Sequence, residues 1–225
     1  MNRLVLSIFP GIDLLGRGFE AEGFCVVRGP DLLWGGDVRL FHPPTGVFDG
    51  VIGGPPCQVF SRAGQISGTS AVDLVPEFVR VCQEVSPQWI VMENVVDAIG
   101  HPSIPADWWP CILRDWDCGG LTARRRAFWT WPFALPDMPR RAGEPSPSVM
   151  ATSWKRGPRT SQYVQDKGFL PGDLPVSEYG RLQGASDVVA VLEAHRSSKA
   201  FTVHVLGNGV PLPMVRTLAS AVRSD

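Results

Sequence analysis

The sequence predicts an α/β protein, with helices on both faces of a sheet and a small irregular lobe. In the first half of the chain, short apolar runs that end at glycine or proline alternate with amphipathic segments, a pattern typical of strands followed by helices. Residues 134–172, in contrast, are rich in Pro, Gly, Ser and Arg and have poor periodicity. A chain of 225 residues can enclose one substantial core beside such a lobe.

The N-terminal segment has the order strand, turn, helix, strand. The apolar run 4–9 ends at Pro10-Gly11 and predicts a strand, residues 13–23 predict an amphipathic helix, and residues 24–27 predict a second strand. A tight turn between a first strand and a helix opens many nucleotide-binding units. We therefore expect a ligand to bind near the end of the first strand.

A third strand, residues 48–52, breaks at two glycines and two prolines and delivers Cys57 into a loop. Glycine lets the backbone approach a ligand closely and proline fixes φ, so Cys57 should be held stiffly at the carboxyl edge of the sheet. Ligands bind at that edge in open α/β sheets. The thiol is therefore a candidate nucleophile, and the alternative is a small buried cysteine after a tight turn. This stretch alone favours neither interpretation.

The later elements follow from the same kinds of pattern. A polar loop at 59–72 is long enough to indicate a function. Helices are predicted at 71–85, at 177–184 with a capped N-terminus, and at 213–222. Strands are predicted at 89–92 and in the segment that runs towards 131. The Trp- and Pro-rich residues 101–120 are interpreted as residues that pack in the core or the lobe. Glu93 follows one of these strands, and alternation places Arg124 and Arg126 on one face of the other.

Composition and charge narrow the class of protein. No apolar run approaches the roughly 18–20 residues that span a bilayer, and the N-terminus lacks a signal-peptide layout, so we expect a cytoplasmic protein without a membrane partner. Five scattered cysteines without a Cys-x-x-Cys pair predict neither disulfides nor a metal site. Residues 1–100 carry six arginines, no lysine and eleven carboxylates, whereas residues 123–167 carry nine basic and three acidic side chains. A basic region on an acidic body is expected where one face meets phosphates.

The order of several motifs resembles that of the cytosine-C5 DNA methyltransferases, most of all their compact phage and prophage members. The resemblance covers nearly the whole chain, and its segments are Phe9-Pro10-Gly11-Ile12 with Gly18-Phe19-Glu20, Gly36-Asp37-Val38, Gly54-Pro55-Pro56-Cys57-Gln58-Val59-Phe60-Ser61, Met92-Glu93-Asn94-Val95, Leu121 to Trp131, Ser177 to Gly184, and Leu206 to Pro213. The chain departs from the family pattern at Asp13 and Leu14 (usually glycines), at Arg28-Gly29-Pro30-Asp31 (usually Glu), at Thr122 (usually Gln) and at Gly209 (usually Ser).

The resemblance implies a Rossmann-like sheet that uses S-adenosylmethionine, yields S-adenosylhomocysteine and needs no metal. The implied cofactor-binding residues are Phe9, Pro10, Gly11, Ile12, Asp13, Asp31, Asp37, Val38, Pro55, Leu74, Asn208, Gly209 and Val210. Two of these assignments are particular to this chain. Asp13 could N-cap the helix or lie near the cofactor's ammonium, and capping is favoured. Asp31 is the nearest substitute for the ribose-binding Glu.

The resemblance also implies a domain division and a chemistry. Residues 1–132 would form the catalytic and cofactor-binding domain, 133–174 a small target-recognition region, and 175–225 a segment that returns to the catalytic domain. The thiolate of Cys57 would attack C6 of cytosine so that C5 becomes nucleophilic. Glu93 would hold a proton for N3, Arg126 would donate to O2, and Arg124 would orient Glu93 or bind phosphate. The base that removes the C5 proton is not identified, and water is a candidate.

A stacked base cannot be attacked above its ring, so the target cytosine must be flipped out of duplex DNA. The residues expected to contact DNA are Gln58, Ser61, Arg62, Arg140, Arg141, Lys155, Arg156, Arg159 and Arg181. We expect a monomer that methylates a short site in a bacterial or phage-infected cell, as enzymes of restriction–modification do. Two alternatives stay open: methylation of RNA cytosine, and a catalytically inactive DNA-binding relative.

Overall fold

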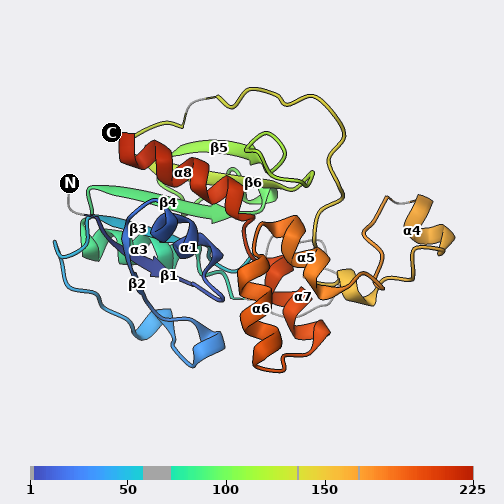
Figure 1. The fold of residues 1–225 in the computed structure, drawn as a ribbon. Helices are drawn as coiled ribbons and strands as arrows, with labels where there is room; N and C mark the ends of the chain where they lie inside the picture. Colours follow the sequence, from blue (N-terminus) through green and yellow to red (C-terminus); the bar gives the residue numbers. More distant parts are fainter. Residues whose placement is uncertain (1–2, 58–71, 136, 167, 225) are drawn as a thin grey trace.

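The fold is built on a single mixed sheet (Figure 1). The structure, a computed structural model, describes residues 3–57, 72–135, 137–166 and 168–224. Its six strands are β1 (Leu4–Ile8), β2 (Cys25–Arg28), β3 (Gly50–Gly53), β4 (Trp89–Asn94), β5 (Trp109–Arg114) and β6 (Arg125–Trp131), in the spatial order β2-β1-β3-β4-β6-β5. The first four are parallel, while β6 runs antiparallel to β4 and to β5. The start of β6 therefore lies beside the end of β4.

Helices cover both faces of this sheet. They are α1 (Leu14–Ala21), α3 (Val75–Val85), α4 (Gln162–Asp166), α5 (Val176–Gln183), α6 (Ser186–Ala194), α7 (Lys199–Asn208) and α8 (Leu212–Ser224). Side chains alternate between the faces of a strand, and in β4 this sends Ile90 and Met92 to one core and Val91 to the other. The first core contains the apolar face of α3, and the second contains α1 and α8, which Figure 1 shows together on one side of the sheet.

A third core lies beside the sheet. It joins α5, α6 and α7 to Leu14 at the start of α1 and to Val149. The crossing of α5 and α6 is close, because a Cβ at Gly180 would lie 2.5 Å from Cγ2 of Val189. The helix α4 projects away from the sheet, at the far right of Figure 1.

The predicted fold class is confirmed, and most elements predicted in the first hundred residues are found within a few positions. α3 begins at Val75, with Pro76 in its first turn, where a missing N–H costs nothing. Four elements were missed: β5, α4, α6 and α7. The predicted N-terminal side-chain cap of α5 is wrong, since its N-cap is Pro175 and no side chain bonds there. Across the described ranges, no helix has the length and apolar content needed to cross a membrane.

Candidate active site

Cys57 lies just beyond the carboxyl end of β3, in the loop that the glycines and prolines create. β3 is buried along its whole length, and Gly53 packs so tightly on β1 that a Cβ there would lie 2.4 Å from the carbonyl oxygen of Ile8. The thiol is half-buried. Burial raises the pKa of Cys57, the negative charge of Glu93 raises it further, and the positive charges of Arg126 and Arg124 oppose both. These four side chains, which lie in or next to β3, β4 and β6, therefore share one electrostatic environment.

Glu93 occupies the matching position at the end of β4. Its Oε1 lies 2.8 Å from Nε of Arg126, and only 11% of its side chain is exposed. Burial raises the pKa of Glu93, although the neighbouring arginines oppose this shift. The backbone before Cys57 presses against the carboxyl group, because a Cβ at Gly54 would lie 2.8 Å from Oε2 of Glu93. Burial therefore makes this carboxyl group easier to protonate than one in water, as a proton donor requires.

Asn94 is a structural member of the site that was not assigned a role from sequence. Its Nδ2 donates to the carbonyl of Pro55 at 3.2 Å, and its Oδ1 accepts from the backbone of Val95 at 2.8 Å. The side chain is 1% exposed. It ties the end of β4 to the loop that carries Cys57, so the Glu-Asn pair in the sequence was the available signal.

Arg124 differs from Arg126 despite their spacing of two. Its guanidinium donates to the carbonyl of Val149, and to that of Gly207 at 2.6 Å. The residue is 2% exposed, so the alternative in which it binds phosphate is inconsistent with this structure. Burial lowers the pKa of Arg124 to about 9, which leaves it charged at neutral pH. Arg124 thus links β6 to the last turn of α7 and to the chain before residue 150.

The turn after β1 meets the chain that follows β2. Oδ1 of Asp13 accepts from the backbone N–H of Gly16 at 2.9 Å, so Asp13 N-caps α1, as favoured. Its Oδ2 lies 2.8 Å from Nε of Arg28. Asp31 accepts from the backbone N–H of Gly11 at 2.8 Å and from that of Leu33 at 2.7 Å. Both carboxylates are therefore engaged by protein groups at this edge of the sheet.

Other predicted cofactor residues converge on the same edge. Phe9, Val38 and Leu74 belong to one apolar cluster. Pro55, two residues before Cys57, is buried. The segment 206–213 packs on the start of α1, because a Cβ at Gly209 would lie 2.6 Å from Cδ1 of Leu14. The remaining predicted members lie in these same segments: Pro10 and Ile12 in the turn, Asn208 at the end of α7, and Val210, which is 5% exposed, just after it.

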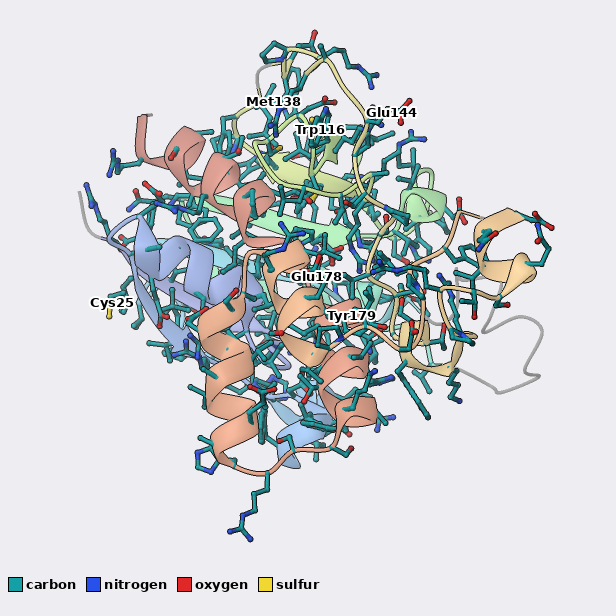
Figure 2. All side chains as sticks on the ribbon, turned by 45° about the vertical axis from the view of Figure 1, so that its right-hand side comes forward. Cys25, Trp116, Met138, Glu144, Glu178 and Tyr179 are labelled. Carbon is teal, nitrogen blue, oxygen red and sulfur yellow. The ribbon has the colours of Figure 1, made fainter. Side chains whose placement is uncertain are left out.

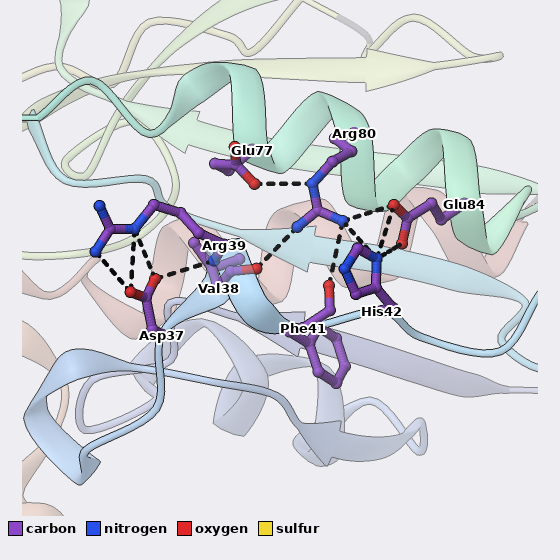
Figure 3. A network of polar contacts seen from close by, with 8 residues as sticks. All are labelled: Asp37, Val38, Arg39, Phe41, His42, Glu77, Arg80 and Glu84. Atoms are coloured by element: carbon purple, nitrogen blue, oxygen red, sulfur yellow. Dashed lines mark hydrogen bonds and ion pairs between the residues drawn. The ribbon is translucent and has the colours of Figure 1, made fainter.

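Asp37 is held by a network that sequence reasoning missed (Figure 3). Its carboxylate accepts from the backbone N–H and the guanidinium of Arg39. The segment is anchored to α3 by Arg80, which donates to the carbonyls of Val38 at 2.8 Å and Phe41 at 3.2 Å. Two carboxylates of α3 hold Arg80 in place: Glu77 and Glu84. The i,i+3 and i,i+4 spacing of these charges was the signal in the sequence.

The comparisons with known proteins agree with these motifs. Residues 35–104 match the family model of C-5 cytosine-specific DNA methylases. The chain is 35% identical over 122 residues to the Type II methyltransferase M.AquIA of Picosynechococcus sp.. This match covers 42% of this chain and 49% of that protein. It is 52% identical over 71 residues to the Type II methyltransferase M1.HphI of Haemophilus parahaemolyticus, and this match covers 30% of this chain and 19% of that protein.

These sequence matches support a resemblance of this chain to the cytosine-C5 DNA methyltransferase family, carried by residues 35–104. The fold is similar to that of a prophage-encoded E. coli protein described as a DNA modification methyltransferase, with a TM-score of 0.65, 18% identity and 98% coverage of both chains. The matched segments cover less than half the length of the curated relatives. The family depends on S-adenosylmethionine, and within the described residues no cluster of His, Cys, Asp and Glu could hold a metal ion.

The basic residues predicted to meet DNA are spread over several surfaces of the molecule. Gln58, Ser61 and Arg62 lie outside the described residues. Arg141 stacks on Trp116 at 3.8 Å, where the segment between Met138 and Glu144 passes over that ring (Figure 2). Arg140 has 83% of its side chain exposed.

The other basic residues lie around the third core. Arg156 stacks on Phe169 at 3.8 Å, and Lys155 lies 5.2 Å from the ring of Trp154. Arg181 of α5 pairs with Glu178, which Figure 2 labels beside Tyr179. The contact of Arg159 with Asp173 uses the backbone N–H of Arg159 and not its guanidinium. The cationic groups of Lys155 and Arg156 thus lie against aromatic rings.

Proposed function

We propose that this chain transfers a methyl group from S-adenosylmethionine to C5 of a cytosine in duplex DNA, through a covalent bond between Cys57 and C6. The proposal is carried by one observation: the Cys57 thiol shares its electrostatic environment with a buried carboxyl group and the guanidinium paired to it. A thiol, an acid and a cation are the groups that this reaction needs around one pyrimidine ring.

In the proposed mechanism, the sulfur of Cys57 gives up its proton and forms a bond to C6. The electron pair of the C5–C6 double bond is then available at C5, while charge that reaches N3 and O2 must be neutralised. Glu93, whose pKa is raised by burial, holds a proton towards N3, and Arg126 donates to O2. After methylation, loss of the C5 proton to a base re-forms the double bond and releases Cys57. Water is the candidate base.

Bound S-adenosylmethionine supplies the methyl group as an electrophile. The residues present fit this cofactor, because the turn at Gly11 has open space beside its Cα and lies near the apolar side chains of Phe9 and Leu74. Asp37 is the candidate acceptor for its adenine amino group, and Asp31 lies at the same edge of the sheet, bonded to the Gly11 turn. We assign Asn208, Gly209 and Val210 to the same wall, since Gly209 packs on the start of α1.

The proposed division of labour follows the chain. Residues 1–132 carry the catalytic and cofactor groups, 133–174 read the target, and 175–225 return to close the catalytic domain. The packing of α8 on α1 supports the last part, as does the third core, which includes Leu14. Flipping of the cytosine would be assisted by phosphate contacts from the basic residues, with strong salt dependence. We propose a monomer in the cytoplasm acting on duplex DNA.

The direct test is covalent trapping. A duplex containing 5-fluorocytosine, incubated with the protein and cofactor, should give a stable adduct on Cys57 by mass spectrometry, because fluorine at C5 cannot leave as a proton does. Cys57→Ala should give no adduct and no transfer of labelled methyl groups while DNA binding survives. An adduct on another residue, or full transfer by Cys57→Ala, would refute the mechanism. Competition with structured RNA would redirect the substrate assignment if RNA were methylated faster.

A further inference from the structure

The two main departures from the family pattern contact each other. The turn at 9–13 follows β1, and the segment 28–34 follows β2; four contacts join them. These contacts are Phe9 N–H to the Pro30 carbonyl at 3.3 Å, Gly11 N–H to Oδ2 of Asp31 at 2.8 Å, Trp34 Nε1 to the Gly11 carbonyl at 2.8 Å, and Arg28 Nε to Oδ2 of Asp13 at 2.8 Å. Two stretches that each look aberrant alone thus form one unit.

The turn has a conformation that needs outside support. Phe9, Gly11 and Asp13 all have left-handed backbone angles, with φ of 56°, 56° and 55°. Two of these are not glycine, and side chains with a Cβ adopt this region only where the surroundings hold them there. The family pattern has glycine at position 13, and glycine would tolerate this angle without support. Asp13 therefore requires contacts that a glycine would not.

Asp13 receives such contacts at both carboxylate oxygens: Oδ1 is hydrogen-bonded, and Oδ2, which has no hydrogen-bond partner among the described residues, faces the charge of Arg28. It is 3% exposed, it accepts from Oγ of Ser7 at 3.0 Å and from the backbone of Gly16, and Arg28 faces its second oxygen. The guanidinium of Arg28 is also 2.9 Å from Oε1 of Glu20, which lies near the other end of α1. A buried carboxylate is tolerated only when it is paired and hydrogen-bonded.

Asp31 supports the same turn from the other end. Its two oxygens accept one backbone N–H each, from Gly11 in the turn and from Leu33 in its own segment. The indole of Trp34 then fixes the Gly11 carbonyl, although the Trp34 side chain is otherwise 68% exposed. The peptide groups on both sides of Gly11 are thus bonded to the segment after β2.

We propose that Arg28 and Asp31 are positioning residues that hold the 9–13 turn in the shape that receives the methionine part of the cofactor. In this chain, the Arg28–Asp13 pair replaces the backbone freedom of the two family glycines. The inference rests on the proposed function, since it assigns these residues to the cofactor site of that reaction. Asp31 acts on the turn rather than as the acceptor of ribose hydroxyls.

The first experiment is a double-mutant cycle on cofactor affinity. Titration calorimetry would measure the Kd for S-adenosylhomocysteine in wild type, Asp13→Asn, Arg28→Gln and the double variant. Asparagine keeps the cap of α1 but loses the charge. Each single change is expected to weaken binding about tenfold, and the double variant no more than either single, because both remove one interaction. In methyl transfer, KM for the cofactor should rise while kcat changes little.

The matched control is Arg17→Gln, which removes another α1-associated ion pair, the exposed one with Asp187. Its Kd should stay within about twofold of wild type. Additive losses in the double variant, or an unchanged Kd in both singles, would overturn the inference. A wild-type chain that binds no S-adenosylhomocysteine would overturn the proposed function as well, so the two failures are distinguishable. Variants that lose affinity while urea unfolding shows them fully folded at the assay temperature would support the inference.

A second experiment separates positioning from ribose binding. Asp31→Ala would be titrated with S-adenosylhomocysteine and with an analogue that lacks both ribose hydroxyls. If Asp31 positions the turn, the variant loses about the same factor, roughly tenfold, with both ligands. If the loss vanishes with the dideoxy analogue, Asp31 binds the ribose directly, and its assignment as a positioning residue is wrong.

Discussion

Replacing Arg124 with methionine is expected to destabilise the fold by about 3 kcal/mol. Methionine fills similar apolar space, but it leaves the buried carbonyls of Val149 and Gly207 without the donor that now reaches both. Each buried acceptor left unpaired costs about 1–3 kcal/mol, and removing a buried charge recovers part of the sum. For a chain of this size, about 3 kcal/mol corresponds to a fall in Tm of roughly 6–12 °C.

Urea unfolding followed by circular dichroism measures this change, because the midpoint and slope give the free energy of unfolding. The control is Arg125→Met, at the exposed position between the two functional arginines, where we expect a change within about 0.5 kcal/mol. If Arg124→Met were as stable as Arg125→Met, the guanidinium would not hold these segments together, and its role would have to be sought in the bound complex with DNA.

Three further predictions concern the site. Glu93→Gln should lower the pH midpoint for alkylation of Cys57, because the charge of Glu93 raises the pKa of that thiol, and Arg126→Gln should raise this midpoint. Peptide mass spectrometry of the alkylated protein across a pH series measures both midpoints. Shifts of the same sign would contradict the electrostatic account. Gly54→Ala should displace the Glu93 carboxyl group, since its Cβ would lie 2.8 Å from Oε2, and so reduce methyl transfer by about tenfold or more in a folded protein; unimpaired transfer would show that the contact is unimportant. Thr122→Val should cost about 1–3 kcal/mol through its lost 2.7 Å bond to the buried carboxylate after β5, whereas Thr122→Ser, which keeps the hydroxyl, should cost less in the same urea assay.

Much of the fold could be predicted because its first half follows local rules. Each early strand is an apolar run that ends at glycine or proline, and α3 has a clear apolar face. β5 was missed because Trp109-Pro110 looks unlike a strand; proline is tolerated there since β5 is an edge strand. α7 was missed because its apolar residues do not form a single stripe, and the third core encloses it on several sides.

The candidate site was predicted in its residues but not in all its contacts. The motif order brought Cys57, Glu93 and Arg126 together, and their geometry is consistent with the proposed roles. The ion pair of Asp13 and Arg28 could not be predicted from local pattern, since it joins residues fifteen positions apart, one in the turn after β1 and one at the end of the neighbouring strand β2. Pairing across a sheet depends on strand order, which a single sequence states only indirectly.

Three consecutive arginines enter β6 with three different fates. Arg124 is enclosed, Arg125 faces solvent, and Arg126 meets a carboxylate. The pleat turns Arg125 away from the other two, and the neighbouring segments then separate Arg124, which meets the carbonyls of Val149 and Gly207, from Arg126, which meets Glu93. A one-residue deletion between β5 and β6 that let β6 slip along β4 would therefore exchange these tasks without altering the composition. Such a deletion should disable the chain more thoroughly than replacing any one of the three, and the length of that hairpin is accordingly as much a functional element as the residues it delivers.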